Sequence, residues 1–243
     1  MKKTMMLLAA FLAFGFTEMS GQNYDKSKIP SFTLENPLEF VNGKKVKNAA
    51  DWRARRQEIL GIFQSEMYGR MPSAPDDVIT ETLDEGETLA GFAVRRQIRM
   101  WFKADKSGPK IDWLVVTPKH IKGPAPVVLL LNYGGNHTVL EDEEILIWPN
   151  YTRVGQNETL QPRGSMNKLN SRTIIPVNML IARGYAVVTA CYEDISPDPD
   201  PCFDENIAYT RIFELWGERD PQRTDNTTSL VAWGWGLMRG MDM

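Results

Sequence analysis

The sequence predicts an α/β fold, in which helices cover a mostly parallel β-sheet. Two apolar runs, Val127 to Leu131 and Tyr185 to Tyr192, are bounded by turn-forming residues and have the length of strands buried on both faces. Between them, residues 176–183 have a helical pattern that closes at Gly184, the residue type preferred after a helix. A strand, a helix and a strand in this order predict a βαβ unit, which places two parallel strands in one sheet.

A helix is expected ahead of this sheet, beginning after Asn48. Asn48 is a favoured N-cap residue, and Asp51 three positions later makes an arrangement similar to a capping box. Gly69 and Pro72 end the pattern. The apolar residues of the segment share one helical face: Trp52, Ile59, Leu60, Phe63 and Met67. The segment therefore predicts an amphipathic helix.

Two further strands are expected between this helix and the first apolar run. Residues 92–102 and 111–117 are rich in apolar and aromatic side chains, which favour strands. Residues 104–109 are turn-forming and separate the two runs. The stretch therefore predicts a β-hairpin at the start of the sheet.

The C-terminal residues 230–243 predict a second amphipathic helix. Trp233 falls at helical spacing with Leu230, Leu237 and Met241, so we expect Trp233 to pack in the core. No stop signal follows this helix in the sequence.

The N-terminus has the pattern of an export signal. Lys2 and Lys3 precede an apolar run, Met5 to Phe16, which is too short to span a bilayer but suits a secretory signal. With cleavage near Gly21, the organisation is a signal peptide at 1–21, an irregular segment at 22–47 and a single domain at 48–243. We expect a periplasmic or secreted protein that is not in the membrane after cleavage. The formal charge of −3 gives no indication of a nucleic-acid partner.

The two cysteines leave two interpretations open. Cys191 lies in a predicted strand and Cys202 in a loop rich in proline and aspartate. In an oxidising compartment the two can form a disulfide that holds this loop. The alternative is one buried thiol and one loop thiol.

Six local sequences carry a resemblance to a known family, and they occur in order from about Phe32 to the end of the chain. They are residues 51–59 leading to 67–69, 131–137, 163–165, 183–186, 194–198 and 232–237. Each segment alone is weakly specific, but the ordered set resembles the glucuronoyl esterase group, carbohydrate esterase family 15, of the α/β-hydrolase superfamily. The resemblance implies the N-terminal part of a three-layer α/β-hydrolase.

The resemblance also implies a chemistry. Family members hydrolyse esters of glucuronic acid, such as those between xylan side chains and lignin alcohols, with a Ser-His-acid triad and no cofactor. The serine lies in a G-x-S-R-x-G-K motif, but no serine or cysteine of this chain has glycine two places before it. His120 and His137 both precede any position for that serine, whereas α/β-hydrolases place the histidine last.

The triad is therefore expected beyond Met243, and this chain alone is expected to be inactive and prone to aggregation through a strand edge. For the intact protein the implied substrate is an ester of glucuronoxylan. Two alternatives stay open: an acetyl xylan esterase-like hydrolase acting on acetylated xylan, and a non-catalytic truncated remnant.

One element of a hydrolase site is a candidate within the chain. Gly134, Gly135 and Asn136 follow an apolar strand, where α/β-hydrolases place the loop that supplies an oxyanion-hole N–H. Glycine lets the backbone approach a ligand closely. The alternative is a plain glycine turn, which serves only to end the strand.

Other polar and aromatic residues have simpler interpretations. Residues 141–144 are four carboxylates in a row without the spacing of a metal site, so we expect a solvated acidic turn and no metal. His137 is interpreted as a loop histidine and His120 as a surface residue. Trp148 and Trp216 lie in predicted loops and are candidates to border a cleft.

Overall fold

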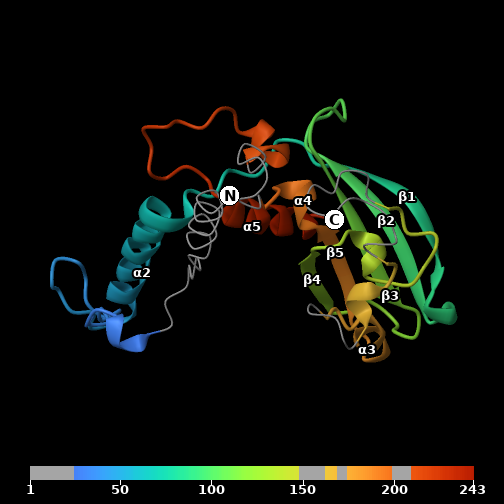
Figure 1. Cartoon of the computed structure of the whole chain (residues 1–243), viewed down its shortest axis with the longest axis horizontal. Coiled ribbons are helices and arrows are strands. Elements are labelled where there is room, and N and C mark those ends of the chain that lie inside the picture. The colour runs from blue at the N-terminus through green and yellow to red at the C-terminus, as the bar shows by residue number, and fades with distance from the viewer. Residues whose placement is uncertain (1–24, 148–161, 169–173, 199–208) are drawn as a thin grey trace, which may run out of the picture. The chain divides into compact units, whose positions relative to one another are not determined.

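The computed structural model describes residues 25–147, 162–168, 174–198 and 209–243 (Figure 1). The predicted signal peptide lies outside these residues, as do Trp148 and Cys202. The chain divides into two compact units, one up to Arg55 and one from Arg56 onward, and each is described by itself. Among the described residues, no helix is long and apolar enough to cross a membrane.

The first unit is largely irregular, as its polar composition predicts. It contains a 3-10 turn at Lys26–Lys28 and an isolated bridge between Glu39 and Lys45. Helix α2, Ala49–Phe63, begins in this unit. The predicted cap is confirmed: Asn48 Oδ1 accepts hydrogen bonds from the backbone N–H groups of Ala50 (2.9 Å) and Asp51 (3.0 Å).

Helix α2 continues into a π-helical turn, Gln64–Tyr68, and ends at Gly69, as predicted. Gly69 has a φ of +76°, and a Cβ there would lie 1.9 Å from the carbonyl oxygen of Asn226. The predicted apolar face does not pack in a core, because Trp52, Phe63 and Met67 are 39, 44 and 60% exposed. The periodicity therefore located the helix correctly but not the burial of its face.

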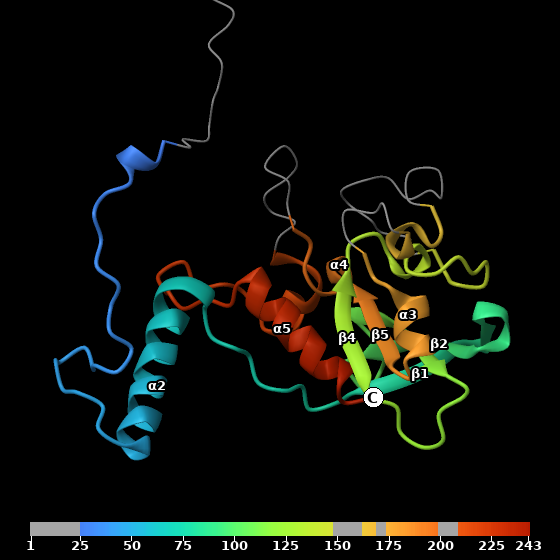
Figure 2. The ribbon, with the colours of Figure 1, turned by 90° about the horizontal axis from the view of Figure 1, so that it is seen from below.

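A five-stranded sheet forms the centre of the second unit (Figure 2). The strand order is β1-β2-β3-β5-β4; only β4 and β5 pair in parallel, and the other neighbours are antiparallel. The strands are β1 Ile79–Thr88, β2 Ala93–Trp101, β3 Lys110–Pro118, β4 Val127–Asn132 and β5 Ala186–Cys191.

The α/β class and the βαβ unit are confirmed, but the described sheet is mixed and not mostly parallel. The first three strands are joined by short connections, and tight connections permit only antiparallel pairing. The segment between β4 and β5 contains α3, Val177–Ala182, and is long enough for a parallel crossover. Strand β1 was not predicted, because its sequence is mainly polar and half of its residues are exposed.

Strands β4 and β5 differ in burial although both are apolar. Every residue of β5 is buried, as predicted. Strand β4 lies at the edge of the described sheet, and Val127 is 52% exposed, so the expectation of burial on both faces is wrong for β4. The same apolar pattern thus occurs in a central strand and in an edge strand.

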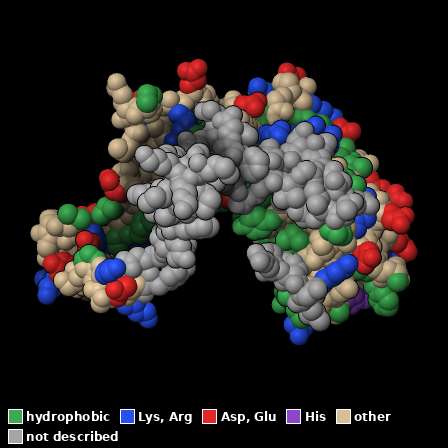
Figure 3. Space-filling view, in the orientation of Figure 1, with side chains coloured by type: hydrophobic (Ala, Val, Ile, Leu, Met, Phe, Trp, Pro, Cys, Tyr) green, Lys and Arg blue, Asp and Glu red, His purple; other side chains and the backbone are tan. Residues whose placement is uncertain are grey.

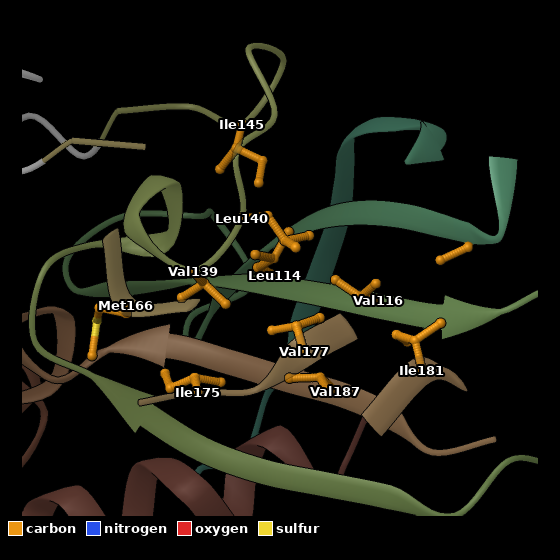
Figure 4. Close-up of a cluster of buried hydrophobic side chains, with 11 residues drawn as sticks. Leu114, Val116, Val139, Leu140, Ile145, Met166, Ile175, Val177, Ile181 and Val187 are labelled. Atoms are coloured by element: carbon orange, nitrogen blue, oxygen red, sulfur yellow. The ribbon is translucent and has the colours of Figure 1, made fainter. Parts of the chain in front are cut away.

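Two apolar clusters lie on opposite faces of the sheet, because alternate residues of β3 point to opposite sides. Leu114 and Val116 face the cluster that contains α3 residues Val177 and Ile181 (Figure 4). Ile111 and Trp113 face the other cluster, which contains residues of the 3-10 helix Arg211–Leu215 and of α5, Ser229–Gly240. Figure 2 shows α3 and α5 on either side of β4 and β5.

Helix α5 begins where predicted, with Thr228 as its N-cap, but it buries a different face. Leu230 is 59% and Met241 72% exposed, whereas Trp235 is 1% exposed. Trp235 is therefore the fully buried tryptophan of α5, while Trp233 is partly buried and packs against the same apolar cluster, as predicted.

Glycine explains the choice of face in α5. A Cβ on Gly236 would lie 2.4 Å from Ile195 Cδ1, and one on Gly240 would lie 2.7 Å from Trp113 Cη2. Helix α5 packs through its small residues because they allow its backbone to approach both side chains.

Charges of both signs are paired on β1, on β2 and in the turns next to them. On the face shown in Figure 3, basic and acidic side chains are interspersed over the surface. Cross-strand and turn ion pairs join Arg96 to Glu85, Lys106 to Glu81 and Lys119 to Glu87. Such exposed pairs contribute little to stability individually.

The close packing of α5 gives a first prediction. We expect Gly236→Ala to destabilise the fold by about 1–3 kcal/mol, because the new methyl group meets the fully buried Ile195 and overpacking outweighs the gain in helix propensity. The matched control is Gly234→Ala in the same helix, where the nearest atom is 3.7 Å away. That variant should be stabilised by up to about 1 kcal/mol. Urea unfolding measures both, and equal stabilisation of the two variants would contradict this packing.

The edge position of β4 gives a second prediction. An apolar edge strand is a template for pairing with other chains, and lysine on an edge opposes this. We expect Val127→Lys to reduce self-association measured by light scattering at matched concentration. Leu230→Lys is the control, because Leu230 is similarly exposed but lies on α5. An equal effect of both substitutions would mean that general surface charge, and not the edge, governs association.

Candidate functional site

The candidate site lies at the carboxyl ends of β4 and β5. These strands are parallel and in register, so their last residues, Asn132 and Cys191, are partners. The chain leaves β4 through Gly134 and Gly135 into the short turn Asn136–Thr138. Ligands of open α/β sheets bind outside this edge of the strands.

Buried amide side chains hold the loop after β4 in place. Asn132 Nδ2 donates to Asn136 Oδ1 at 2.8 Å and to Thr189 Oγ1 at 3.1 Å. Asn136 Nδ2 donates in turn to the backbone carbonyl of Asp112 at 2.8 Å. Asn132 and Thr189 are fully buried and Asn136 is 9% exposed. The side chain of Asn136 therefore connects the loop to β3.

Asp112 extends this network to the neighbouring segments. Its carboxylate accepts two hydrogen bonds from Arg99, at 2.6 and 2.7 Å, and these raise the pKa of Arg99 above its usual value. Its backbone N–H donates to Asp194 Oδ2 at 2.9 Å. Asp194 belongs to α4, Tyr192–Ile195, the short helix that follows β5. Strands β2 and β3, the glycine loop and α4 are thus joined by one set of polar contacts.

The backbone conformation and the close packing of the predicted oxyanion loop require glycine at both of its glycine positions. Gly135 has a φ of +86°, and a Cβ on Gly134 would lie 2.7 Å from the Thr138 side chain. Thr138 Oγ1 also donates to the Gly135 carbonyl at 2.7 Å. These contacts explain a tight turn. The role of Gly134, Gly135 and Asn136 in an oxyanion hole stays a prediction.

Cys191 is a buried thiol at this edge. Burial raises its pKa well above the usual value, while backbone N–H groups of Glu193 and Gly135 act in the opposite direction. The protonated thiol is a poor nucleophile. Cys191 is free in the structure and Cys202 lies outside the described residues, so the disulfide between them stays a prediction.

His137 and Ser196 lie near this edge, whereas His120 follows the end of β3 at the opposite edge. His137 is 4% exposed, and its backbone carbonyl accepts a hydrogen bond from Gly164. His120 is exposed, as predicted. The hydroxyl of Ser196 lies 2.9 Å from that of Ser229 at the start of α5. Ser196 thus helps to join α4 to α5.

The structure gives Arg163 and Gly164 a role that the sequence did not. Arg163 Nη1 donates to the backbone carbonyls of Asp142 (2.8 Å) and Ile145 (2.6 Å). Gly164 has a φ of +64°, and a Cβ there would lie 2.8 Å from the backbone nitrogen of Glu141. The two residues therefore hold the acidic segment 141–147 against the turn after β4.

The acidic segment is not simply a solvated turn. Asp142 lies 2.5 Å from Arg95 Nη1, and Arg95, which is 3% exposed, also pairs with Asp84 at 2.8 Å. Burial acts to raise the pKa of Asp142, but hydrogen bonds from Thr88 and Arg95 hold it below the ordinary value of 3.8. The described residues contain no group of three or more side chains suited to hold a metal ion.

The sequence contained a partial signal for this network. Arg99 and Asp112 interrupt the apolar pattern of two predicted strands, which marks them as residues with polar partners. Nothing in the sequence indicated that Asn136 would join the glycine loop to Asp112, because that contact depends on the registers of β3 and of β4 against β5.

Comparison with known proteins gives a consistent set of relatives. A carbohydrate esterase from an unknown prokaryotic organism is 32% identical over 234 residues, which cover 93% of this chain and 52% of the relative. A glucuronoyl esterase from Solibacter usitatus has a solved structure with 32% identity and a TM-score of 0.76, over 90% of this chain and 55% of that one. The chain thus spans about half the length of these relatives.

A third relative also has a solved structure. The solved structure of a promiscuous CE15 esterase from a marine bacterial metagenome is 30% identical, with a TM-score of 0.72 over 90% of this chain and 55% of that one. No model of a known protein family matches the chain.

The ion pair of Asp142 gives a third prediction. We expect Asp142→Asn to lower stability at neutral pH by roughly 2 kcal/mol, because Arg95 loses one of its two carboxylate partners in a buried site. The folded pKa of Asp142 is lower than the unfolded one, so its contribution is present above about pH 4 and is lost as the pH falls through the folded pKa.

The measurement is urea unfolding between pH 3 and 7, with Glu143→Gln as the control. Glu143 is the exposed neighbour in the same acidic run. The difference between the native chain and Asp142→Asn should shrink below pH 4, and a difference independent of pH would contradict the assignment.

Proposed function

We propose that this chain, which belongs to the glucuronoyl esterase-like carbohydrate esterase family 15, forms part of an ester hydrolase that acts on glucuronate esters of plant cell-wall xylan and lignin. The observation that carries the proposal is 32% identity over 93% of the chain to a carbohydrate esterase. The fold agrees, since a solved glucuronoyl esterase matches 90% of the chain with a TM-score of 0.76.

The chain supplies the scaffold of the site and not its nucleophile. None of its serines stands in the G-x-S motif of a nucleophile elbow. We assign the Ser-His-acid triad to the part of the relatives that this chain does not span. In the intact enzyme the serine would attack the ester carbonyl, and negative charge would develop on the carbonyl oxygen.

Within the chain, the loop after β4 is the element proposed to act on the substrate. The Gly135 N–H is directed at the Cys191 thiol, and the N–H groups of Gly134 and Asn136 are the proposed donors at the carboxyl edge of β4 and β5, where a donor to the developing oxyanion is required. The network of Asn132 and Asn136 holds the loop rigid, so that the donors need no reorganisation during the reaction. Gly134 and Gly135 keep the edge free of side chains.

The proposed location is outside the cytoplasm. The charged start and short apolar run of residues 1–21 support cleavage of an export signal. Polymeric xylan is itself found outside cells, so export places the enzyme with its proposed substrate.

A second candidate function is an esterase of broader range, including acetyl xylan esters. The observation that favours it is the description of one relative, 30% identical, as a promiscuous CE15 esterase. The rates of hydrolysis of methyl glucuronate and of an acetylated xylo-oligosaccharide distinguish the two candidate functions.

The test uses a hybrid, which gives a fourth prediction. Residues 48–243 of this chain replace the corresponding half of the Solibacter usitatus glucuronoyl esterase. We expect the hybrid to release methanol from methyl glucuronate and this chain alone to show no rate above buffer, because only the hybrid contains a triad. A folded hybrid without esterase activity would contradict the proposed function.

Gly135→Ala in the hybrid tests the loop. The substitution forces a side chain onto a backbone with a φ of +86° and displaces the N–H donors, so kcat should fall by about 10²-fold. Gly61→Ala is the matched control, because a Cβ there meets nothing within 4 Å. A loss in Gly135→Ala at unchanged melting temperature supports the oxyanion role. Activity within twofold of the parent hybrid would overturn it.

A further inference from the structure

A pocket of about 670 Å³ lies beside α5, apart from the glycine loop. Its walls come from residues 73–77, residues 102–105, Leu215, Trp216 and Trp235. It shares no residue with the network of Asn132 and Asn136. Its volume lies within the range of about 300–1,000 Å³ that is usual for small-molecule sites.

The apolar wall of the pocket is a set of interlocked aromatic rings. Trp235 meets Phe102 and Trp216 edge to face, with ring centroids 5.1 and 5.4 Å apart. Trp216 contacts Phe213 in the same manner at 5.0 Å. Trp235 Nε1 donates to the Ser73 carbonyl at 2.9 Å, which fixes the indole. The wall is therefore held in one arrangement before any ligand binds.

Trp216 is the part of this wall that a ligand reaches. Trp235 and Phe102 are 1 and 5% exposed, whereas Trp216 is only partly buried. A half-buried indole offers a rigid apolar surface to a ring with an apolar face.

The rim of the pocket is acidic. Asp76, Asp77 and Asp105 are exposed there, against the single cation Lys103. Hydrogen bonds from Ser107 hold the pKa of Asp105 below its usual value, so this carboxylate is ionised. Ionised carboxylates only accept hydrogen bonds, which suits hydroxyl groups and disfavours a second carboxylate.

We propose that this pocket binds a neutral sugar unit of a polysaccharide main chain, such as xylose, with its ring against Trp216 and its hydroxyls donating to the rim carboxylates. The aromatic wall together with acceptors selects a polyhydroxylated ring, and the excess of carboxylates excludes a uronate. The choice of a plant polysaccharide as the source rests on the proposed function.

The pocket lies at the same edge of the sheet as the glycine loop. Strand β2 ends at Trp101 opposite Lys110, the first residue of β3. Strand β3 runs antiparallel to β5, so its start lies toward the carboxyl end of β5. The pocket and the glycine loop are therefore at the same edge of the sheet, which is compatible with one branched substrate that contacts both.

The test measures binding without ester hydrolysis, so that its failure is distinct from failure of the proposed esterase activity. Xylotetraose and free glucuronate are titrated against the full chain and followed by tryptophan fluorescence. A low protein concentration limits association through β4. We expect xylotetraose to change the fluorescence and glucuronate to bind at least about tenfold more weakly, since like charges repel.

Variants locate the binding. Trp216→Ala should weaken xylotetraose binding at least about fivefold, because an aromatic contact of ordinary strength is lost. Trp52→Ala is the matched control, an exposed tryptophan outside the pocket, and should leave the affinity unchanged. Circular dichroism verifies the fold of each variant.

If Trp216→Ala fails to fold, the double variant Asp76→Asn and Asp77→Asn is used to measure binding instead. Both carboxylates are exposed, so the fold should tolerate their loss. We expect weaker xylotetraose binding, by at least about threefold, and weaker discrimination against glucuronate. The proposal is overturned if the folded chain does not bind xylotetraose, if glucuronate binds equally well, or if folded variants bind like the native chain.

Discussion

Asp112 and Asn136 form the contact on which the carboxyl edge of the sheet depends. The side-chain amide of Asn136 donates to the backbone carbonyl of Asp112. The Asp112 carboxylate accepts hydrogen bonds from Arg99, and the Asp112 backbone N–H donates to the Asp194 carboxylate. Each group is buried or partly buried, so an unmade bond would leave an unpaired polar group at a cost of about 1–3 kcal/mol. The network therefore specifies one arrangement of the glycine loop, α4 and β3 rather than several.

The apolar packing supports this edge from both faces of the sheet. Helix α3 covers one face and α5 the other, and α5 approaches closely because Gly236 and Gly240 face Ile195 and Trp113. Ile195 belongs to the same short helix as Asp194, which the polar network holds. Packing of α5 and positioning of the loop are thus coupled through α4.

In the proposed function, the two candidate sites divide the recognition of a branched polysaccharide between them. The glycine loop presents backbone groups suited to an ester carbonyl, whereas the pocket at Trp216 combines an aromatic wall with carboxylate acceptors suited to a neutral ring. Both lie at one edge of the sheet because β3 is antiparallel to β5. A single antiparallel pairing therefore brings residues far apart in the sequence to the same edge.

The sequence by itself determined the local elements: the cap at Asn48, the buried strand β5 and the helix that Gly184 closes, since each depends on periodicity or on one residue's conformation. The ordered local sequences also identified the family. The tertiary structure alone decided the face of α5, the edge position of β4 and the partners of Asn136 and Asp142. These features depend on which segments meet across the sheet. A periodic pattern predicts that a residue is buried, but it does not identify the residues that pack against it.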